Sequence, residues 1–443
     1  MTFHIHRAVR TAELADGLGA LLADPADDPF AEEVVVVPEH GVERWLAQRL
    51  SHRLGGGSEG EGGVCAGVRF VRPASLVTML TGRELDDPWL PSHLVWPLLA
   101  TMDGTLDELW AAPLARHLGH GDDSVDGQVR QGRRYGLALR LARLLHRYAL
   151  QRPAVLTAWR EGRDEDGAGS ALPDDLRWQA ELYRRLLEVV DAPPPDLRHT
   201  ETLDRLRAGD ATLDLPGRLS LFGHTRLPVT EVELLRALAE HRDVHLWLPQ
   251  PSPAAWTALV DRLDGDGVVP RAADRSADTV AHPLLASLGR DSRELARVLS
   301  PQDGDVDELL AAPVAEPTTV LGWLQSDIAA NRVPDAAVRG VRVPAPDDRS
   351  LSIHACHGPT RQVEVLREVL VGLLEDDPTL EPRDVLVMCP DVEVYAPLIG
   401  AAFGLGDHGT DATGVDTHPA HRLRVSLADR SLRATNPLLS VAE

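Results

Sequence analysis

The sequence contains no lysine, so all 45 of its basic residues are arginines. A phosphate-binding P-loop needs the point charge of a lysine on the nucleotide phosphates. The planar fork of arginine has a different shape and does not substitute freely for it. A nuclease centre built from two carboxylates and a lysine is excluded from this chain for the same reason. The absence argues against a chain that hydrolyses a nucleotide by itself.

Cysteines and long apolar runs are also scarce. The three cysteines, Cys65, Cys356 and Cys389, are far apart and form no CxxC pair, which excludes a disulfide framework and a cysteine zinc site. No apolar run reaches about 18 residues, the length that a membrane-spanning helix needs. The N-terminus, MTFHIHRAVR, has no apolar signal core. We therefore expect a cytoplasmic protein without a membrane partner.

Positive charge is outweighed by negative charge. The chain has 68 acidic residues and a formal net charge of −23. Binding of a nucleic-acid backbone is driven by cations and would be opposed by that field. Any DNA contact must therefore be a local arginine patch or channel. Acidity that serves only solubility explains the same net charge about as well.

The most informative stretch is residues 350–391. Apolar residues recur at helical spacing from 363 to 374, between two apolar segments at 351–356 and 385–389. Two apolar strands joined by one amphipathic helix predict a parallel βαβ unit. Ligands of such sheets bind beyond the carboxyl ends of the strands. The loop that leads to Arg361 is therefore a candidate nucleic-acid contact.

A second set of apolar segments predicts a larger sheet. We expect its strands at 3–6, 34–37, 68–71, 219–222 and 244–248. A mostly helical region at about 74–210 interrupts them, and the segment 334–350 is typical of an interdomain linker. The sequence predicts a first domain at 1–333 and the start of a second at 351–443, inside which the chain ends.

Acidic pairs and paired histidines do not by themselves predict a site. Asp-Glu strings such as 307–310 are similar to metal-holding motor carboxylates, but they do not follow a buried apolar strand. We interpret them as solvated helix starts. His4 and His6 share one strand face, and without a third ligand at fixed spacing they predict no metal site.

One segment is strongly basic. Residues 130–153 contain no acidic residue, and on a helix Arg133, Arg140, Arg143 and Arg147 fall within one arc. An unpaired arginine face in an acidic protein favours a phosphate-binding surface. Pairing of these arginines with acidic residues of a neighbouring element or subunit is an equally good interpretation.

Several sequence phrases, by their order and spacing, resemble a known family. They are PEHGVERWLAQRL at 38–50, RPASL at 72–76, RYALQRP at 147–153, RLSLFGHTRLP at 218–228 and HACHGPTRQVEVLREVL at 354–370. The chain resembles the RecC family, the gamma subunit of the RecBCD (exodeoxyribonuclease V) complex. The resemblance implies an α/β fold of two inactive helicase-like, P-loop motor-type domains with parallel sheets, the first with an inserted helical subdomain.

The resemblance also implies a role. RecB-like and RecD-like subunits would complete a heterotrimer and hold ATP and Mg²⁺, while this chain would bind no cofactor and carry no catalytic site. Its surface would guide the 3′-ended single strand at double-strand breaks and, as a further expectation, recognise a Chi-like hotspot. The DNA contacts implied are His40, Arg44, Arg72, Arg143, Leu144, Arg147, Arg152 and Arg361.

At most of the positions that the resemblance associates with hotspot recognition, this chain has a different residue type from the one the resemblance implies. Leu144 and Arg152 keep the residue type that the family resemblance implies. The departures are at Pro38, Arg44, Thr78, Arg143 and His146. This chain is therefore expected to recognise a different sequence, or none.

Other functions stay open at this point. An active motor would carry its phosphate loop at 34–46, but this segment has one glycine and no lysine, so we interpret it as a dead site retained for its fold. The missing lysine also weighs against an active helicase or nuclease. An AddB-like helicase–nuclease subunit and a scaffold that contacts only proteins are the remaining alternatives.

Overall fold

The computed structural model describes residues 1–24, 31–54, 63–82, 86–209, 213–262, 269, 272–311, 316–403, 420 and 423–427. The chain forms two compact units. Unit 1 comprises residues 1–318 and 322–343, and unit 2 comprises residues 319–321 and 344–443. The predicted end of the chain inside a second domain concerns residues 428–443, which lie outside the described residues. The helicase-like character and the exact domain boundaries stay predictions.

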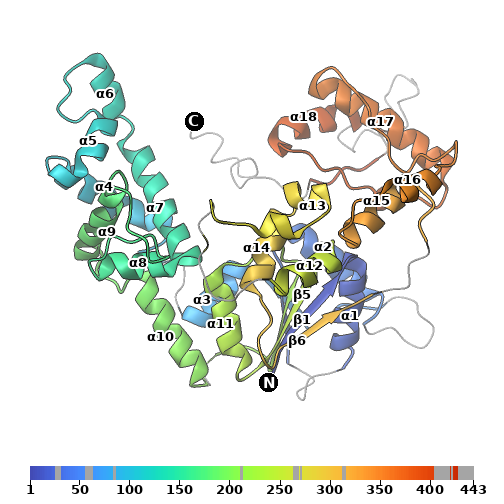
Figure 1. Cartoon of the computed structure of the whole chain (residues 1–443), viewed down its shortest axis with the longest axis horizontal. Helices are drawn as coiled ribbons and strands as arrows, with labels where there is room; N and C mark the ends of the chain where they lie inside the picture. Colours follow the sequence, from blue (N-terminus) through green and yellow to red (C-terminus); the bar gives the residue numbers. More distant parts are fainter. Residues whose placement is uncertain are drawn as a thin grey trace, which may run out of the picture. The chain divides into compact units, whose positions relative to one another are not determined.

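Unit 1 is built on one parallel sheet with the strand order β3-β2-β4-β5-β1-β6. Figure 1 labels β5, β1 and β6 of this sheet. The strands are β1 (Phe3–Ala8), β2 (Glu33–Val36), β3 (Val68–Val71), β4 (Arg218–Phe222), β5 (Asp243–Pro249) and β6 (Val306–Leu309). Every neighbouring pair of strands runs parallel. The predicted α/β class and the five predicted strands of the first sheet are confirmed.

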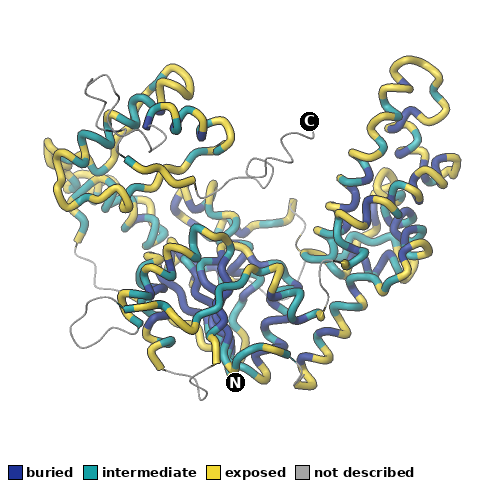
Figure 2. The backbone as a smooth tube through the Cα atoms, turned by 180° about the vertical axis from the view of Figure 1, so that it is seen from behind, coloured by how far each residue is buried: buried dark blue, intermediate teal, exposed yellow. Residues whose placement is uncertain are grey.

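Helices cover both faces of this sheet. One layer is α1 (Thr11–Leu22) and α2 (His40–Ser51), and the other is α3 (Pro73–Thr81), α11 (Val229–Ala239), α12 (Pro253–Val260) and α14 (Arg290–Val298). The short helices α13 (Pro283–Leu288) and η2 (Ser276–Thr279) pack against α14. Successive side chains of a strand point to opposite faces, so a sheet covered twice needs apolar residues at every position. Val35 packs with the first layer and Val36 with the second. The inner strands β1, β2, β4 and β5 are accordingly largely buried and dark blue in Figure 2, whereas β3 at one edge is half-buried and β6 at the other edge is exposed.

A lobe of helices is inserted between β3 and β4. It comprises α4 (Pro91–Thr105), η1 (Leu109–Ala111), α5 (Ala112–Leu118), α6 (Val125–Gln131), α7 (Arg134–Gln151), α8 (Pro153–Arg160), α9 (Arg177–Val189) and α10 (Pro195–Arg207). The lobe has a core of its own, which includes Leu98, Trp159 and Tyr183. Leu206 near the end of α10 packs instead with the core of the sheet. The inserted helices are therefore anchored on the sheet at their last turn.

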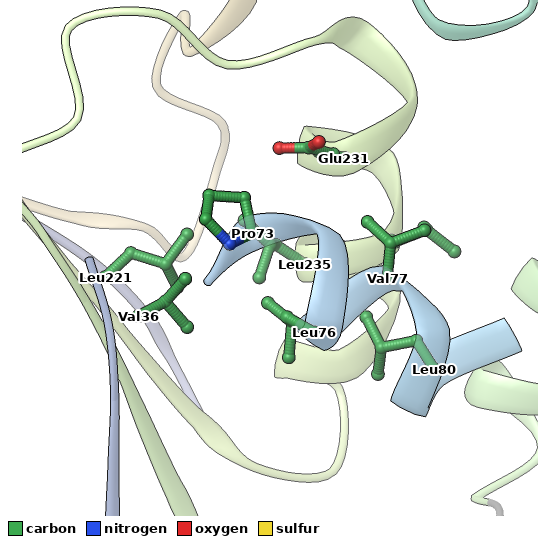
Figure 3. A pocket seen from close by; sticks show the side chains of 9 residues that line it. Val36, Pro73, Leu76, Val77, Leu80, Leu221, Glu231 and Leu235 are labelled. Atoms are coloured by element: carbon green, nitrogen blue, oxygen red, sulfur yellow. The ribbon is translucent and has the colours of Figure 1, made fainter. Parts of the chain in front are cut away.

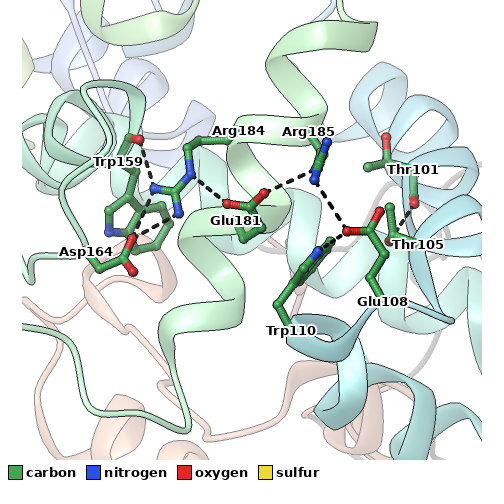
Figure 4. A network of polar contacts seen from close by, with 9 residues as sticks. All are labelled: Thr101, Thr105, Glu108, Trp110, Trp159, Asp164, Glu181, Arg184 and Arg185. Atoms are coloured by element: carbon green, nitrogen blue, oxygen red, sulfur yellow. Dashed lines mark hydrogen bonds and ion pairs between the residues drawn. The ribbon is translucent and has the colours of Figure 1, made fainter.

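A polar network joins α9 to the loop after α8 (Figure 4). The guanidinium of Arg184 donates to Glu181 at 2.9 Å, to Asp164 at 3.0 Å and to the carbonyl oxygen of Trp159 at 3.2 Å. The side chain of Arg184 is only 25% exposed. Because these charge-assisted hydrogen bonds are partly shielded from water, they contribute more than a surface ion pair.

Replacing Arg184 tests how much this network stabilises the lobe. Arg184→Ala removes the side-chain donor of Asp164 and one of the donors of Glu181 and of the Trp159 carbonyl oxygen, so we expect the free energy of unfolding to fall by about 1–3 kcal/mol. Urea denaturation measures it. Arg177→Ala on the same helix is the control, because its partner Asp174 is 90% exposed, and its effect should stay within about 0.5 kcal/mol. Equal losses in both variants would contradict the role given to the network.

Unit 2 contains α17 (Gly358–Asp376), η3 (Pro382–Asp384) and α18 (Val392–Phe403). The preceding helices, α15 (Val320–Ala329) except its first two residues and α16 (Ala336–Val341), belong to unit 1. Helices α17 and α18 pack together through Val363, Ile399 and Phe403. The helix predicted inside residues 350–391 is therefore confirmed as α17. Among the described residues, no helix combines the length and apolar character that crossing a membrane requires.

The prediction of a strand on either side of α17 is wrong. Residues 351–356 and 385–389 are not strands in the part of the chain that the structure describes. A strand exists only when its backbone groups pair with a neighbouring strand, and neither segment has one there. Ile353 is 90% exposed and Met388 is 87% exposed. The apolar pattern of these segments is compatible with a strand, but it does not show whether a neighbouring strand is present to pair with.

β6 corrects a second expectation, because the acidic string at its position was interpreted as a solvated helix start. It forms instead the edge strand beside β1, with Glu308 opposite His6. Arg7 Nε donates to Asp307 Oδ1 at 2.6 Å, and His6 hydrogen-bonds to Glu308. The acidic side chains are thus paired by residues of the neighbouring strand, about 300 positions away along the chain.

Candidate nucleic-acid interface

The segments that follow β2 and β3 lie side by side at the carboxyl edge of the sheet. Val36 at the end of β2 is in register with Val71 at the end of β3. The guanidinium of Arg72 donates to His40 Nε2, and His40 Nδ1 lies 2.9 Å from Glu43 Oε2. Both His40 and Arg72 are exposed. The structure therefore brings together two of the residues predicted to bind DNA.

The connection from β2 to α2 is too short for a nucleotide loop. Only Val37, Pro38 and Glu39 separate the strand from the helix, whereas a P-loop uses a longer glycine-rich turn that wraps around the phosphates. Glu39 caps α2 without a side-chain hydrogen bond, so the first N–H groups of the helix remain available to an anion. Arg44 in the second turn is exposed and has no ion-pair partner among the described residues.

The basic face of α7 is exposed along its length. Arg133, Arg140, Arg143 and Arg147 are all exposed, and none of them forms an ion pair with a residue that the structure describes. The opposite face, which includes Leu141, is buried in the core of the lobe. Pairing with a described neighbouring element is therefore contradicted. The alternative of pairing with another subunit stays open.

The last turn of α7 docks on the helix layer of the sheet. The hydroxyl of Thr230 on α11 donates to the carbonyl oxygen of Leu150 at 3.0 Å. Leu144 is half-buried against the lobe core. Arg152 is exposed at the C-terminal cap of the helix, directly before Pro153. This contact fixes the position of the arginine face relative to the sheet.

Arg361, the last predicted contact, belongs to unit 2. It is exposed on the first turn of α17, and its guanidinium donates to Glu364 at 2.9 Å. Unlike the arginines of α7, it therefore has an acidic partner on its own helix.

A cavity of about 760 Å³ lies between α3, α7, α10 and α11. Thr78 and His146, two of the positions that depart from the family pattern, are on its wall. Across the cavity, the ion pair between Arg198 and Asp87 has a nitrogen–oxygen distance of 2.9 Å. The volume is within the range of pockets that hold small ligands, about 300–1,000 Å³. The cavity is therefore large enough for an unstacked base.

The arginine face borders this cavity. On α7, His146 is three positions after Arg143 and Leu150 is three positions after Arg147, so each arginine is a surface neighbour of one of these residues. His146 and Leu150 line the cavity, whereas the two arginines are exposed. Burial lowers the pKa of His146, so its imidazole is neutral at pH 7. One helix thus presents cations suited to phosphates beside neutral groups suited to bases.

Glu231 is the acidic residue of the cavity with the most perturbed environment. It lies on the first turn of α11, close to Pro73 and Val77 of α3, where an apolar pocket continues toward the sheet (Figure 3). Burial raises the pKa of its carboxyl group to about 7. No sequence motif marks Glu231, which is only an acidic side chain at the start of an apolar helix.

Comparisons with known proteins place this chain in a family. Residues 3–331 match the family model described as "RecC, N-terminal domain". The chain belongs to the RecC family. A RecC of Mycobacterium tuberculosis is 56% identical over 443 residues, covering all of this chain and 39% of that protein. For Mycolicibacterium smegmatis the identity is 56% over 446 residues, covering all of this chain and 38% of that protein.

A more distant relative is the RecC of Escherichia coli, which is 29% identical over 463 residues, covering 93% of this chain and 38% of that protein. All three relatives carry the name RecBCD enzyme subunit RecC. This chain spans about two fifths of the length of the RecC proteins it matches.

In this RecC-family chain the predicted contacts fall into three groups. The groups are His40, Arg44 and Arg72 at the carboxyl edge of the sheet, Arg143, Leu144, Arg147 and Arg152 on or next to α7, and Arg361 in unit 2. Sequence reasoning missed the polar residues that α10 and α11 add to the cavity, such as Arg198 and Glu231. No motif marks them, because they meet α7 only through the fold.

The raised pKa of Glu231 predicts a pH-dependent stability. The folded chain holds this proton up to pH about 7, whereas the unfolded chain releases it near pH 4.5. The resulting stabilisation is complete below pH 4.5 and is lost as the pH rises through 7. Glutamine carries no titrating proton, so the variant does not lose this stabilisation at high pH. The free energy of unfolding of Glu231→Gln, minus that of the natural chain, should therefore be about 1–3 kcal/mol larger at pH 8 than at pH 5. Urea denaturation at the two pH values measures this gain.

Glu201→Gln is the matched control, because Glu201 lies on the same cavity but is exposed. Its effect on unfolding should be the same at both pH values. A Glu231→Gln variant whose effect does not change with pH would show that this carboxyl group is solvated like any other.

Proposed function

We propose that this chain is a non-catalytic DNA-channel and scaffold part of a RecBCD-type helicase–nuclease, which repairs double-strand breaks by homologous recombination in the cytoplasm. RecB-like and RecD-like subunits are its partners, and they hold the ATP and Mg²⁺ that the reaction uses. The chain guides the 3′-ended single strand and holds no cofactor for this task. Membership of the RecC family and the name borne by its relatives support this role. The same match favours this role over that of an AddB-like subunit.

The exposed arginine face of α7 is the observation that supports DNA binding most directly. From Arg133 to Arg147 it extends about 21 Å along the helix at 1.5 Å per residue. Its four arginines have no acidic partner among the described residues, in a chain whose net charge is −23. Phosphates would neutralise these cations and release counterions, which is the main driving force for binding single strands.

The cavity beside α7 gives the bases of such a strand a place to enter. Its wall combines apolar groups with hydrogen-bonding side chains, among them Thr78 and His146. Sequence-specific contacts need polar groups at base edges, whereas phosphate contacts only position the strand. Recognition of a Chi-like hotspot would therefore depend on this wall. Because its residues depart from the family pattern, we propose that any hotspot read here differs from that of the best-studied relatives.

A double substitution on α7 tests the channel. Arg143→Ala with Arg147→Ala, in the assembled complex, should weaken binding of a single-stranded oligonucleotide. The slope of log K against log salt should fall in magnitude by about 1.4, because each lost phosphate contact contributes about 0.7 for a single strand. Fluorescence anisotropy across a salt series measures both quantities.

The control is Arg163→Ala with Arg177→Ala, two surface arginines of the same lobe that already have acidic partners. Its salt slope should stay at the natural value. If the α7 variant assembles and leaves the slope unchanged, or if it prevents assembly with the other subunits, the scaffold that contacts only proteins is the better description.

The division of labour among the subunits has its own test. Replacing the P-loop lysine of the RecB-like or RecD-like motor should abolish the ATPase activity of that motor, because no lysine in this chain can replace it. A coupled ATPase assay measures the loss. Hydrolysis of ATP by this chain purified alone would overturn the non-catalytic assignment.

A further inference from the structure

Three histidines gather on the face of the sheet that α1 covers. His4 and His6 alternate along β1, and the parallel pairing of β1 with β5 sets His245 opposite His4. One ring nitrogen of each histidine lies within 4.8 Å of the other two. His6 and His245 are buried, whereas His4 is half-buried and leaves the group accessible from one side. The third ligand that the sequence did not reveal is therefore supplied by a strand some 240 residues away.

The nitrogens of two of these rings already face each other. His6 Nε2 and His245 Nδ1 are 2.9 Å apart, and the two rings are within 7° of parallel. Two nitrogens bound to one tetrahedral Zn²⁺ lie about 3.3 Å apart, since each metal–nitrogen bond is about 2.0–2.1 Å. The ring of His4 stacks on His245 with centroids 4.3 Å apart. Side-chain rotations within this group can bring all three nitrogens onto one ion.

A carboxylate occupies the other nitrogen of His6. β6 places Glu308 opposite His6, and its carboxylate hydrogen-bonds to His6 Nδ1. Metal-bound histidines generally donate their second N–H to a carboxylate, which fixes the tautomer and leaves the first nitrogen for the metal. Trp247, which β5 sets opposite His6, stacks on the His6 ring with centroids 3.9 Å apart. The position and orientation of the His6 ring are thus fixed from two directions.

We propose that His4, His6 and His245 bind one divalent transition-metal ion of the zinc class, with Glu308 as the carboxylate that orients His6 and water as the fourth ligand. Three imidazole nitrogens suit Zn²⁺ or Co²⁺, whereas Mg²⁺ and Ca²⁺ require oxygen ligands. The ion joins β1 to β5 near the amino ends of these strands, so it stabilises the sheet. This inference does not depend on the proposed DNA-binding role.

Titration of the full chain with Co²⁺ alone, after removal of metals with a chelator, tests the site. We expect one Co²⁺ per chain, with the visible absorption of four-coordinate cobalt, and displacement of that ion by Zn²⁺. Glu308→Gln should keep this stoichiometry and weaken the affinity by about 10–100-fold. His4→Ala should weaken it further, while His117→Ala, which removes an exposed histidine of α5, should have no effect.

Three results would overturn the proposal. They are no saturable Co²⁺ binding by the natural chain, unchanged binding by His4→Ala, and equal affinity for the natural chain and Glu308→Gln. The second would mean capture by other histidines of the chain, and the third would mean that Glu308 does not orient His6. Circular dichroism of each metal-free variant separates loss of the site from loss of the fold. Because Glu308 is on an edge strand and partly exposed, its variant remains informative if His4→Ala fails to fold.

Discussion

Burial of the parallel sheet on both faces is the constraint on which the rest of unit 1 depends. A strand covered on both sides can satisfy its backbone only through neighbouring strands and must be apolar at successive positions, as Val34 to Val37 are. The two helix layers follow from this requirement. The register of β2 and β3 brings His40 and Arg72 together, and the contact of Thr230 with α7 positions the arginine face beside the cavity.

Burial and acidic partners distinguish the arginines that stabilise the fold from those that are candidates for binding DNA. Arg7, Arg218 and Arg236 each pair with a carboxylate at distances of 2.6–2.9 Å and are at most 17% exposed. Such pairs fix the geometry of the sheet and its connections. The arginines on the outer face of α7 are the opposite case, since they are exposed and have no acidic partner among the described residues. In a chain with a net charge of −23, this face is a local patch of positive electrostatic potential.

Sequence patterns predicted what depends on local periodicity. The five buried strands were predicted because apolar runs report burial, and the arginine arc of α7 was predicted because helical spacing is regular. β6 was missed because its acidic side chains are paired by Arg7 and His6, which are remote in sequence. The strands expected at 351–356 and 385–389 were wrong because an apolar run cannot show whether a neighbouring strand exists. The cavity and the histidine cluster depend on strand register and helix docking, which no spacing in the sequence encodes.

The most direct measurement is a structure of the assembled complex bound to a duplex with a 3′ single-stranded tail. The predicted result has phosphates of the tail within hydrogen-bond distance of Arg143 and Arg147, and at least one unstacked base in the cavity beside His146. The contrary result has both guanidinium groups paired with carboxylates of a partner subunit and the tail on another surface. That outcome would make the arginine face of α7 a protein interface and this chain a scaffold.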